Sequence, residues 1–368
     1  MMQVKDWQKM NPHFIKTIEV EGLLSRKNVH WELGNVNVLV GQNGSGKSTI
    51  LDLTRFTLLG PNNTKIDSLE EKFYSITVTF NNGNQCTCVL SDPEEHEDHM
   101  LEAIRLLLEK AEYSTHSEPE IERLKKVYNN LLASRESESR QTRVKAFFSG
   151  RHDYMQEGGK NDLFEYINLE FISTFDMILL SKEEQDKNSE EYGSYSQLDI
   201  LISKELNKLS RLIVTKANKT MDQYSLKLLN SKDDIYSLSK SNMNSVNSFI
   251  EKLNQLFNGE NKKFSIDNTG LLKIESNGKE ISHKQLSSGE KQMLYILLKV
   301  VNTSDKPTIL FLDEPEISMH LNWQEQLIDV LRNINSHIQI VAVSHSPALV
   351  MKGWLESYSD MKDITTTI

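Results

Sequence analysis

Alternation of apolar and polar residues dominates the N-terminal quarter of the chain. The runs FIKTIEV (14–20), VHWEL (29–33) and FYSITVTF (73–80) alternate with a period of two, which is typical of strands with one buried face. The run VNVLV (36–40) is mostly apolar and predicts a strand buried on both faces. QCTCVL (85–90) follows after the turn residues NNGN, so the last two runs predict a β-hairpin.

The period lengthens to three or four residues after about position 94. Apolar residues recur at this helical spacing in four runs, LEAIRLLLEKA, IERLKKVYNNLLA, LDILISKELNKLSRLIV and VNSFIEKLNQLF. The apolar run FISTFDMILL and the polar run SKEEQDKNSEEYGSYS, which has the composition of a mobile loop, interrupt them. We therefore expect a helical insertion over 94–260 between two parts of one lobe, 1–93 and 261–368.

Strand and helix patterns alternate again in the C-terminal part. FSIDNTGLLKIESNGKEI (264–281) predicts strand pairs with Gly and Asn turns. A helical run (291–300), the apolar strand TILFL (308–312), another helix and the strand IQIVAV (338–343) follow. The sequence thus predicts an α/β fold with an antiparallel β flank and a large helical insertion.

Charge and composition narrow the class of protein. The 368 residues include 42 Lys+Arg against 52 Asp+Glu, a net charge of −10, which argues against a bulk-basic nucleic-acid binder but leaves local basic patches open. The start, MMQVKDWQKMNPHF, lacks the apolar core of a secretory signal, and no run reaches the ~18 apolar residues of a membrane span. We expect a cytoplasmic protein with no membrane contact.

The sequence has two cysteines, Cys86 and Cys88, both on the predicted strand 85–90. Two positions apart on a strand, their side chains face the same way, which is a poor geometry for a disulfide and supplies too few ligands for zinc. We expect two free thiols in a reducing compartment.

The run GQNGSGKST follows the predicted strand 36–40 and opens a predicted helix. From Gly41 to Ser48 it fits the pattern G-x-x-x-x-G-K-[ST]. In this context the glycines let successive backbone N–H groups curl around phosphate oxygens, Lys47 reaches the β and γ phosphates, and Ser48 Oγ can ligate Mg²⁺. The pattern predicts a site for ATP or GTP. The nucleotide-binding residues that we expect here are Asn43, Gly44, Ser45, Gly46, Lys47, Ser48 and Thr49.

The run TILFLDEPE places Asp313 and Glu314 at the end of an apolar strand. Alone, such a pair is as often a polar loop, but beside a phosphate loop Asp313 can hold Mg²⁺ and Glu314 can polarise the attacking water as general base. His345 ends the strand IQIVAV, 32 positions beyond Asp313, where it could reach a γ-phosphate. We predict Glu314, His345 and Lys47 as catalytic residues, and Ser48 and Asp313 as metal ligands.

A further motif lies far from the phosphate loop, in KQLSSGEKQM. Residues 286–290 fit the pattern L-S-[SG]-G-[EQ]. Ser288 or Ser287 supplies a hydroxyl, Gly289 permits close backbone approach, and the helix 291–300 aims its positive end at a phosphate. An ordinary capped helix start has a similar sequence, since Ser before Gly-Glu is good capping chemistry.

These four motifs stand along the chain in the same order as in the ATP-binding-cassette (ABC) ATPases, which the sequence therefore resembles. The resemblance implies a P-loop NTPase fold of ABC-ATPase type with ATP and Mg²⁺ as cofactors. It also implies a head-to-tail homodimer, or a higher homo-oligomer, with two ATPs at the interface. Ser287, Ser288 and Gly289 would then bind the γ-phosphate of the ATP that the other subunit holds.

Three elements of that family are not clearly matched. Gln85 and Gln185 are the candidates for the glutamine that ends a lobe-linking strand, and Trp31 or Phe14 for the residue that stacks on adenine. The run ISMH, where the family has its D-loop, departs from the SALD of transporters.

The separation of the motifs favours one branch of this class. From Lys47 to Gly289 there are 242 positions, far more than the resemblance implies for transport cassettes. DEPEISMH and SHSP are similar to patterns of the RecF, SMC and OLD-nuclease group, over residues 14–80 and 264–350, and FISTFDMILL is similar to ATPases of Septu and retron systems. OLD nucleases carry a TOPRIM domain after the ATPase, whereas 23 residues follow His345, so we expect any nuclease to be a separate polypeptide.

These resemblances favour an ATPase that hydrolyses ATP to ADP and phosphate and gates a separately encoded effector, a nuclease, in anti-phage defence. They match stand-alone ATPases of Septu-like, retron-associated and PARIS-like systems. A DNA-repair or chromosome-maintenance ATPase acting on DNA stays open, as does a transporter subunit, which the spacing disfavours. Possible nucleic-acid contacts lie around Phe147-Phe148, at Arg135, Arg140, Arg143, Lys145 and Arg151, although a solvated loop is the commoner meaning of such a run. The net-acidic insertion suits protein docking better than DNA wrapping.

Overall fold

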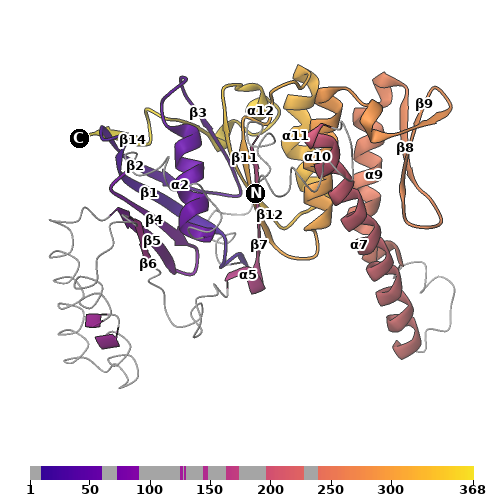
Figure 1. Cartoon of the computed structure of the whole chain (residues 1–368), viewed down its shortest axis with the longest axis horizontal. Helices are drawn as coiled ribbons and strands as arrows, with labels where there is room; N and C mark the ends of the chain where they lie inside the picture. Colours follow the sequence, from indigo (N-terminus) through magenta and orange to yellow (C-terminus); the bar gives the residue numbers. More distant parts are fainter. Residues whose placement is uncertain are drawn as a thin grey trace.

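The computed structural model describes residues 10–59, 73–90, 125–126, 128–129, 144–147, 163–173, 196–227 and 239–368. Two sheets and a group of helices make up most of this part and lie side by side in Figure 1, with the antiparallel sheet at the left, a parallel sheet at the centre and the helices at the right. A small three-stranded sheet of order β10-β9-β8 lies at the far right.

The central sheet is parallel, with the strand order β13-β3-β12-β11-β7. Its strands are β3 (Val36–Val40), β7 (Asn168–Ser173), β11 (Thr308–Asp313), β12 (Ile338–Ser344) and β13 (Tyr358–Asp360). Both faces are covered, because Leu310 and Leu312 of β11 pack into one apolar core while Ile309 and Phe311 pack into the other. Since the strands are parallel, their carboxyl ends meet at one edge, where ligands of such sheets bind.

The antiparallel sheet forms the flank that the sequence predicts, with the order β14-β2-β1-β4-β5-β6. Its strands are β1 (Ile15–Leu23), β2 (Lys27–Glu32), β4 (Ser75–Phe80), β5 (Gln85–Leu90), β6 (Val144–Phe147) and β14 (Thr365–Thr367). The predicted hairpin is confirmed as β4–β5, with Gly83 at a φ of 86° in its turn. Cys86 and Cys88 are buried and unbridged on β5, and burial raises the pKa of each thiol to about 12, so both stay protonated.

Helix α2 (Lys47–Leu59) joins the two sheets, since Phe56 packs into the same core as Ile18 of β1 and Val341 of β12. The other helices and the small sheet are α5 (Leu163–Tyr166), α7 (Gln197–Lys227), α9 (Asn244–Leu256), η4 (Asn258–Glu260), β8 (Lys262–Ile266), β9 (Leu272–Ser276), β10 (Lys279–Ile281), η5 (His283–Gln285), α10 (Ser288–Asn302), α11 (Leu321–Ile334), α12 (Ala348–Met351) and η6 (Leu355–Ser357). No helix in the described residues is long and apolar enough to cross a membrane.

Helix α7 packs along α10 with its N-terminal half, and its other end extends away from the rest of the described chain in Figure 1. Ion pairs fix the contact, with Lys291 Nζ at 2.8 Å from Asp199 Oδ1 and Lys299 Nζ at 3.5 Å from Glu205 Oε1. These pairs hold α7 to the helix that follows the LSSGE motif.

Two strands arise from within the range predicted as a helical insertion. β6 extends the antiparallel sheet beside β5, and β7 forms the edge of the parallel sheet beside β11, where Phe171 stacks on Phe311 at a ring distance of 4.2 Å. The helical periodicity of 94–260 does not account for them, because short edge strands such as NLEFIS carry polar residues that mask the apolar run. The division into 1–93, 94–260 and 261–368 stays a prediction.

Of the four predicted insertion helices, two are confirmed as α7 and α9. LEAIRLLLEKA lies outside the described residues, and IERLKKVYNNLLA is described only at 125–126 and 128–129, which are helical. FISTFDMILL contributes the end of β7, and its remainder lies outside the described residues, as does the polar run that follows it apart from its last residue, Ser196.

Candidate nucleotide-binding site

The loop between β3 and α2 exposes its backbone toward a cavity. Gly44 and Gly46 have φ values of 73° and 102°, a left-handed region in which a side chain would be strained. A β-carbon on Gly46 would also lie 2.9 Å from the Leu23 side chain, whereas the space around Gly44 is open. The loop amides and the N-terminus of α2 therefore present N–H groups that an anion can approach.

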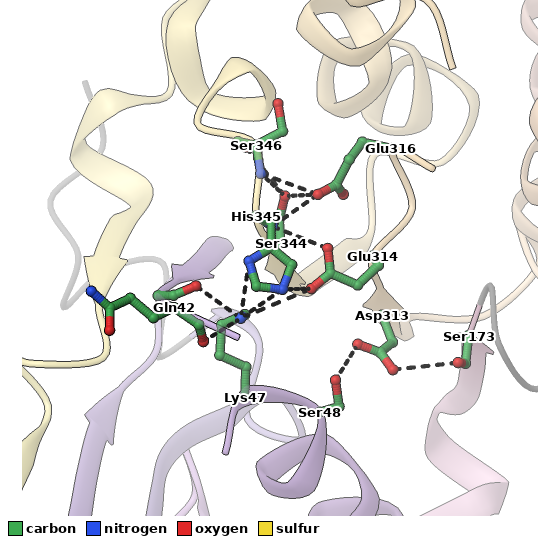
Figure 2. Close-up of polar contacts among 11 residues, drawn as sticks. Gln42, Lys47, Ser48, Ser173, Asp313, Glu314, Glu316, Ser344, His345 and Ser346 are labelled. Atoms are coloured by element: carbon green, nitrogen blue, oxygen red, sulfur yellow. Dashed lines mark hydrogen bonds and ion pairs between the residues drawn. The ribbon is translucent and has the colours of Figure 1, made fainter. Parts of the chain in front are cut away.

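Lys47, the first residue of α2, is buried, with 4% of its surface exposed. Its Nζ donates to the carbonyl oxygens of Gly41 at 2.9 Å and Gln42 at 3.3 Å, and it lies 4.0 Å from Glu314 Oε1 (Figure 2). Burial lowers the pKa of Lys47, and the nearby carboxyl groups of Glu314, Asp313 and Glu316 oppose that shift in part. The ammonium is thus held inside the loop among acceptors.

Asp313, at the carboxyl end of β11, lies between two serine hydroxyls. Ser48 Oγ donates to its Oδ1 at 2.8 Å and Ser173 Oγ donates to its Oδ2 at 3.3 Å (Figure 2). Ser173 ends β7 directly opposite Asp313 in the parallel register. The sequence motifs predict Ser48 and Asp313 as a pair of metal ligands but do not indicate Ser173, whose available signal was a polar residue at the end of NLEFIS.

Glu314 leaves β11 in a left-handed conformation with a φ of 49°, and its N–H donates to the Val343 carbonyl at 2.9 Å. This turn points its buried side chain at His345, whose Nε2 lies 3.0 Å from Glu314 Oε1 and 3.1 Å from Lys47 Nζ. Burial raises the pKa of Glu314 to about 8, and the contact with the Glu316 carboxyl adds to the rise. The pKa of Glu314 is therefore shifted toward neutral pH, the range that suits a general base.

The loop, the acids and the turn after β12 line one cavity of about 710 Å³. Its lining residues are Asn43, Gly44, Ser45, Gly46, Lys47, Ser48, Thr49, Glu314, Glu316, Ile317, His345, Ser346 and Pro347. The predicted phosphate-loop residues, Glu314 and His345 thus come together, and Asp313 adjoins them through Ser48.

The LSSGE motif does not line this cavity. Ser287 caps α10 in a capping box with Glu290, whose carboxylate also pairs with Lys262. Ser287 and Ser288 are exposed, while Gly289 is buried. A β-carbon on Gly289 would overlap the carbonyl oxygen of Ser318, in the run ISMH of the same chain. The close approach that Gly289 permits in this structure is therefore to its own chain, a contact that the sequence analysis did not anticipate.

The structure also locates the weaker candidates. Gln85 lies on β5 and donates to Thr79 Oγ1 at 3.2 Å, so it belongs to the antiparallel sheet and is absent from the lining of the cavity. Trp31 and Phe14 are buried at 1% and 2% exposure, which rules them out as adenine-stacking residues in this conformation. Gln185 lies outside the described residues, as does the basic run 135–151 apart from β6.

The parallel sheet, the glycine loop and the antiparallel flank make the chain a P-loop NTPase of the ABC-ATPase type. Within that class it belongs to the family described as "AAA domain, putative AbiEii toxin, Type IV TA system", whose model matches residues 36–351. The match includes the phosphate loop, the acid pair, the LSSGE motif and His345.

Two relatives, one named for a retron and one for Septu, are similar to the chain. The "Retron Vc95 probable ATPase" of Vibrio cholerae serotype O1 biovar El Tor is 22% identical over 86% of this chain and 66% of its own length. The "Septu protein PtuA" of Bacillus thuringiensis is 31% identical over 23% of this chain and 24% of its own length. The chain thus spans just under two thirds of the first relative and about a quarter of the second. A solved structure, an SMC head bound to the C-winged helix domain of ScpA, aligns with 96% of this chain and 97% of that one, at a TM-score of 0.49 and 13% identity.

Proposed function

We propose that this chain is an ATPase of the defence-associated kind, which closes on ATP as a head-to-tail homodimer and controls an effector on a separate polypeptide, a nuclease. The observation that carries the ATPase assignment is the convergence of Lys47, Asp313, Glu314 and His345 at one edge of the parallel sheet. Lys47 and His345 are 298 positions apart in the sequence, yet their side-chain nitrogens lie within 3.1 Å.

The residues at this edge fit ATP with Mg²⁺. The Ser48 hydroxyl and the Asp313 carboxylate, 2.8 Å apart, are oxygen donors of the kind that Mg²⁺ prefers. We assign them to the metal and assign residues 43–49 to the phosphates, because the loop N–H groups and the open space at Gly44 suit a phosphate chain. When bound, Mg²⁺ would neutralise part of the phosphate charge.

The chain's own side chains supply the remaining chemistry. Lys47 donates to the carbonyls of Gly41 and Gln42, and phosphate oxygens, as stronger acceptors for an ammonium, would draw it toward the β and γ phosphates. Glu314 then accepts a proton from the water that attacks the γ-phosphorus, while the bond from that phosphorus to ADP breaks. His345, which contacts both residues, donates to a γ-phosphate oxygen.

The position of the LSSGE motif supports the dimer. Ser287 and Ser288 are exposed at the start of α10 and lie outside the cavity that the phosphate loop lines. Hydroxyls at the positive end of a helix suit a phosphate. Since they do not line the cavity of their own chain, we assign them to the ATP of a second copy.

The relatives support a role of this chain in defence, since the chain is similar over most of its length to a retron ATPase. The C-terminal half of helix α7 supports docking of a partner protein, because its Val214 and Met221 are 49% and 63% exposed. Exposed apolar side chains on a projecting helix suit a protein surface better than a phosphate backbone.

A pull-down from native cells, paired with an ATPase assay, tests the proposal. The tagged wild-type chain should hydrolyse ATP and retain a genetically linked nuclease, whereas Lys47→Ala should lose hydrolysis. A chain that emerges without a partner, binds DNA with a steep salt dependence and is stimulated by DNA would favour the DNA-repair alternative instead.

A further inference from the structure

Glu316 is a third acid at the candidate site, two positions beyond Glu314. It has 8% of its surface exposed and lines the same cavity. No sequence motif assigns a role to Glu316, although it is the last residue of the run DEPE. A buried carboxylate is costly unless donors surround it, so its hydrogen-bond partners indicate what it does.

Three donors from consecutive residues converge on a single oxygen of Glu316. Its Oε1 accepts from Ser344 Oγ at 2.5 Å, from His345 N at 2.9 Å and from Ser346 N at 3.1 Å (Figure 2). These donors make up the turn by which the chain leaves β12. The carboxylate therefore fixes the backbone from which the His345 imidazole projects.

The His345 amide is shared between two acids. It lies 3.0 Å from Glu314 Oε2 and 2.9 Å from Glu316 Oε1. Without Glu316, the His345 amide would donate to Glu314 alone, and this hydrogen bond would draw the Glu314 side chain toward the turn. With Glu316 in place, Glu314 Oε1 remains near Lys47 and the imidazole.

A second side chain supports the turn at its far end. Ser346 Oγ donates to Gln324 Oε1 at 2.7 Å, and Gln324 Nε2 donates to the Met319 carbonyl at 3.0 Å. Gln324 thus links the turn to the segment that follows Glu316, but it leaves the His345 amide untouched. The position of the imidazole depends on Glu316 more directly.

We propose that Glu316 is a positioning residue for hydrolysis: its carboxylate clamps the turn 344–346 and so aligns His345 and Glu314 on the γ-phosphate. This inference rests on the proposed ATPase function. Loss of Glu316 should therefore affect turnover but not nucleotide binding, because Glu316 contacts neither the phosphate-loop amides nor the hydroxyl of Ser48 in the described contacts.

Steady-state hydrolysis and binding of a non-hydrolysable ATP analogue test the proposal in the full chain. Glu316→Ala removes the acceptor and should lower kcat by roughly 30-fold or more, because small misplacements of reacting groups cost up to about 100-fold. The Kd for the analogue should stay within about threefold of wild type, since binding and turnover separate in such variants. Glu316→Gln keeps an acceptor oxygen and should restore most of kcat.

Two further variants make the result decisive. Glu316→Asp keeps the charge but withdraws the oxygen by one methylene, so kcat should fall even if the alanine variant does not fold. Glu325→Ala removes an acid on α11 that pairs with Lys352 at 2.9 Å, outside the cavity, and should keep the wild-type kcat.

The outcomes separate this inference from the function on which it rests. Wild-type turnover in Glu316→Ala or Glu316→Asp overturns the positioning role, as does a parallel loss of analogue binding and kcat. Absence of turnover in the wild-type chain would instead reject the ATPase function itself.

Discussion

Gly289 of the LSSGE motif packs directly against the backbone carbonyl of Ser318 in the same chain, with no space for a β-carbon between them. Ser318 itself has a φ of 68°, and Gln292 Nε2 holds the neighbouring Pro315 carbonyl at 2.9 Å. The start of α10 therefore packs against the loop that follows Asp313 and Glu314 and supports it. The LSSGE motif thus stabilises its own chain, in addition to its proposed contact with the ATP of a second copy.

Gly289→Ala should destabilise the chain, because the added methyl group meets backbone rather than a movable side chain. We expect a loss of about 1–3 kcal/mol in the free energy of unfolding, the range for overpacked sites. Denaturant unfolding would measure it. Ser288→Ala is the matched control, and as an exposed position it should lie within about 0.5 kcal/mol of wild type. Equal stability of the two variants would show that the loop moves aside freely.

Ser288→Arg should stop hydrolysis without weakening nucleotide binding by the single chain, because its side chain faces solvent rather than its own phosphate loop. It tests the role toward a second copy more cleanly than a change at Gly289, which would also disturb its own chain. Mixing Ser288→Arg with Lys47→Ala should recover hydrolysis from one composite site. If the mixture stays as inactive as its components while both still dimerise, the motif does not act across subunits.

Ser173→Ala should raise the Mg²⁺ concentration needed for half-maximal ATP turnover. The Ser173 hydroxyl orients Asp313 from the side opposite Ser48, and loss of such outer contacts costs roughly 10-fold or more in metal affinity. A titration of ATPase activity with Mg²⁺ at saturating ATP would measure the shift. Ser265→Ala on β8, away from the site, is a suitable control. An unchanged Mg²⁺ requirement would argue that Ser173 only ends the strand.

Glu205→Gln should make stability less dependent on acid pH. Burial alone would raise the pKa of Glu205. The Lys299 charge and the hydrogen bonds from Lys208 and Asn302 outweigh that effect, so the pKa lies below the ordinary value of 4.5. A lowered folded-state pKa contributes stability above the unfolded-state pKa and loses it as pH falls through the folded-state pKa. The Tm difference between wild type and variant should be largest near neutral pH and shrink below about pH 4.5. A difference that stays constant down to pH 3 would contradict this.

Site residues could be predicted from the sequence where they form a local motif or where they lie at the end of a strongly apolar strand. The glycine loop is read from nine consecutive residues. Asp313 ends β11, and Glu314 and His345 directly follow β11 and β12, two strands that are buried along most of their length. A shared sheet edge for those strand ends is what any parallel α/β fold provides. The pairing of Ser48 with Asp313 was predictable for that reason.

Contacts made by short or irregular segments were not predictable in the same way. β7 is a six-residue edge strand inside a mainly helical range, so neither its place beside β11 nor the contact of Ser173 with Asp313 follows from periodicity. The hydrogen bonds from the turn 344–346 to Glu316 depend on the left-handed turn at Glu314. The packing of Gly289 against Ser318 depends on the path of the loop between Glu314 and Ser318. Such details are set by packing between segments far apart in the sequence.

In the proposed function, ATP closes two copies of this chain and Glu314 then drives hydrolysis. The most direct measurement is the solution mass of Glu314→Gln with Mg²⁺, with and without ATP. Because the variant keeps the phosphate loop but lacks the base, its mass should double with ATP and stay doubled, while Lys47→Ala keeps the mass of one chain. A Glu314→Gln chain whose mass does not change with ATP, or that turns over ATP at the wild-type rate, would contradict ATP-driven dimerisation with Glu314 as the base.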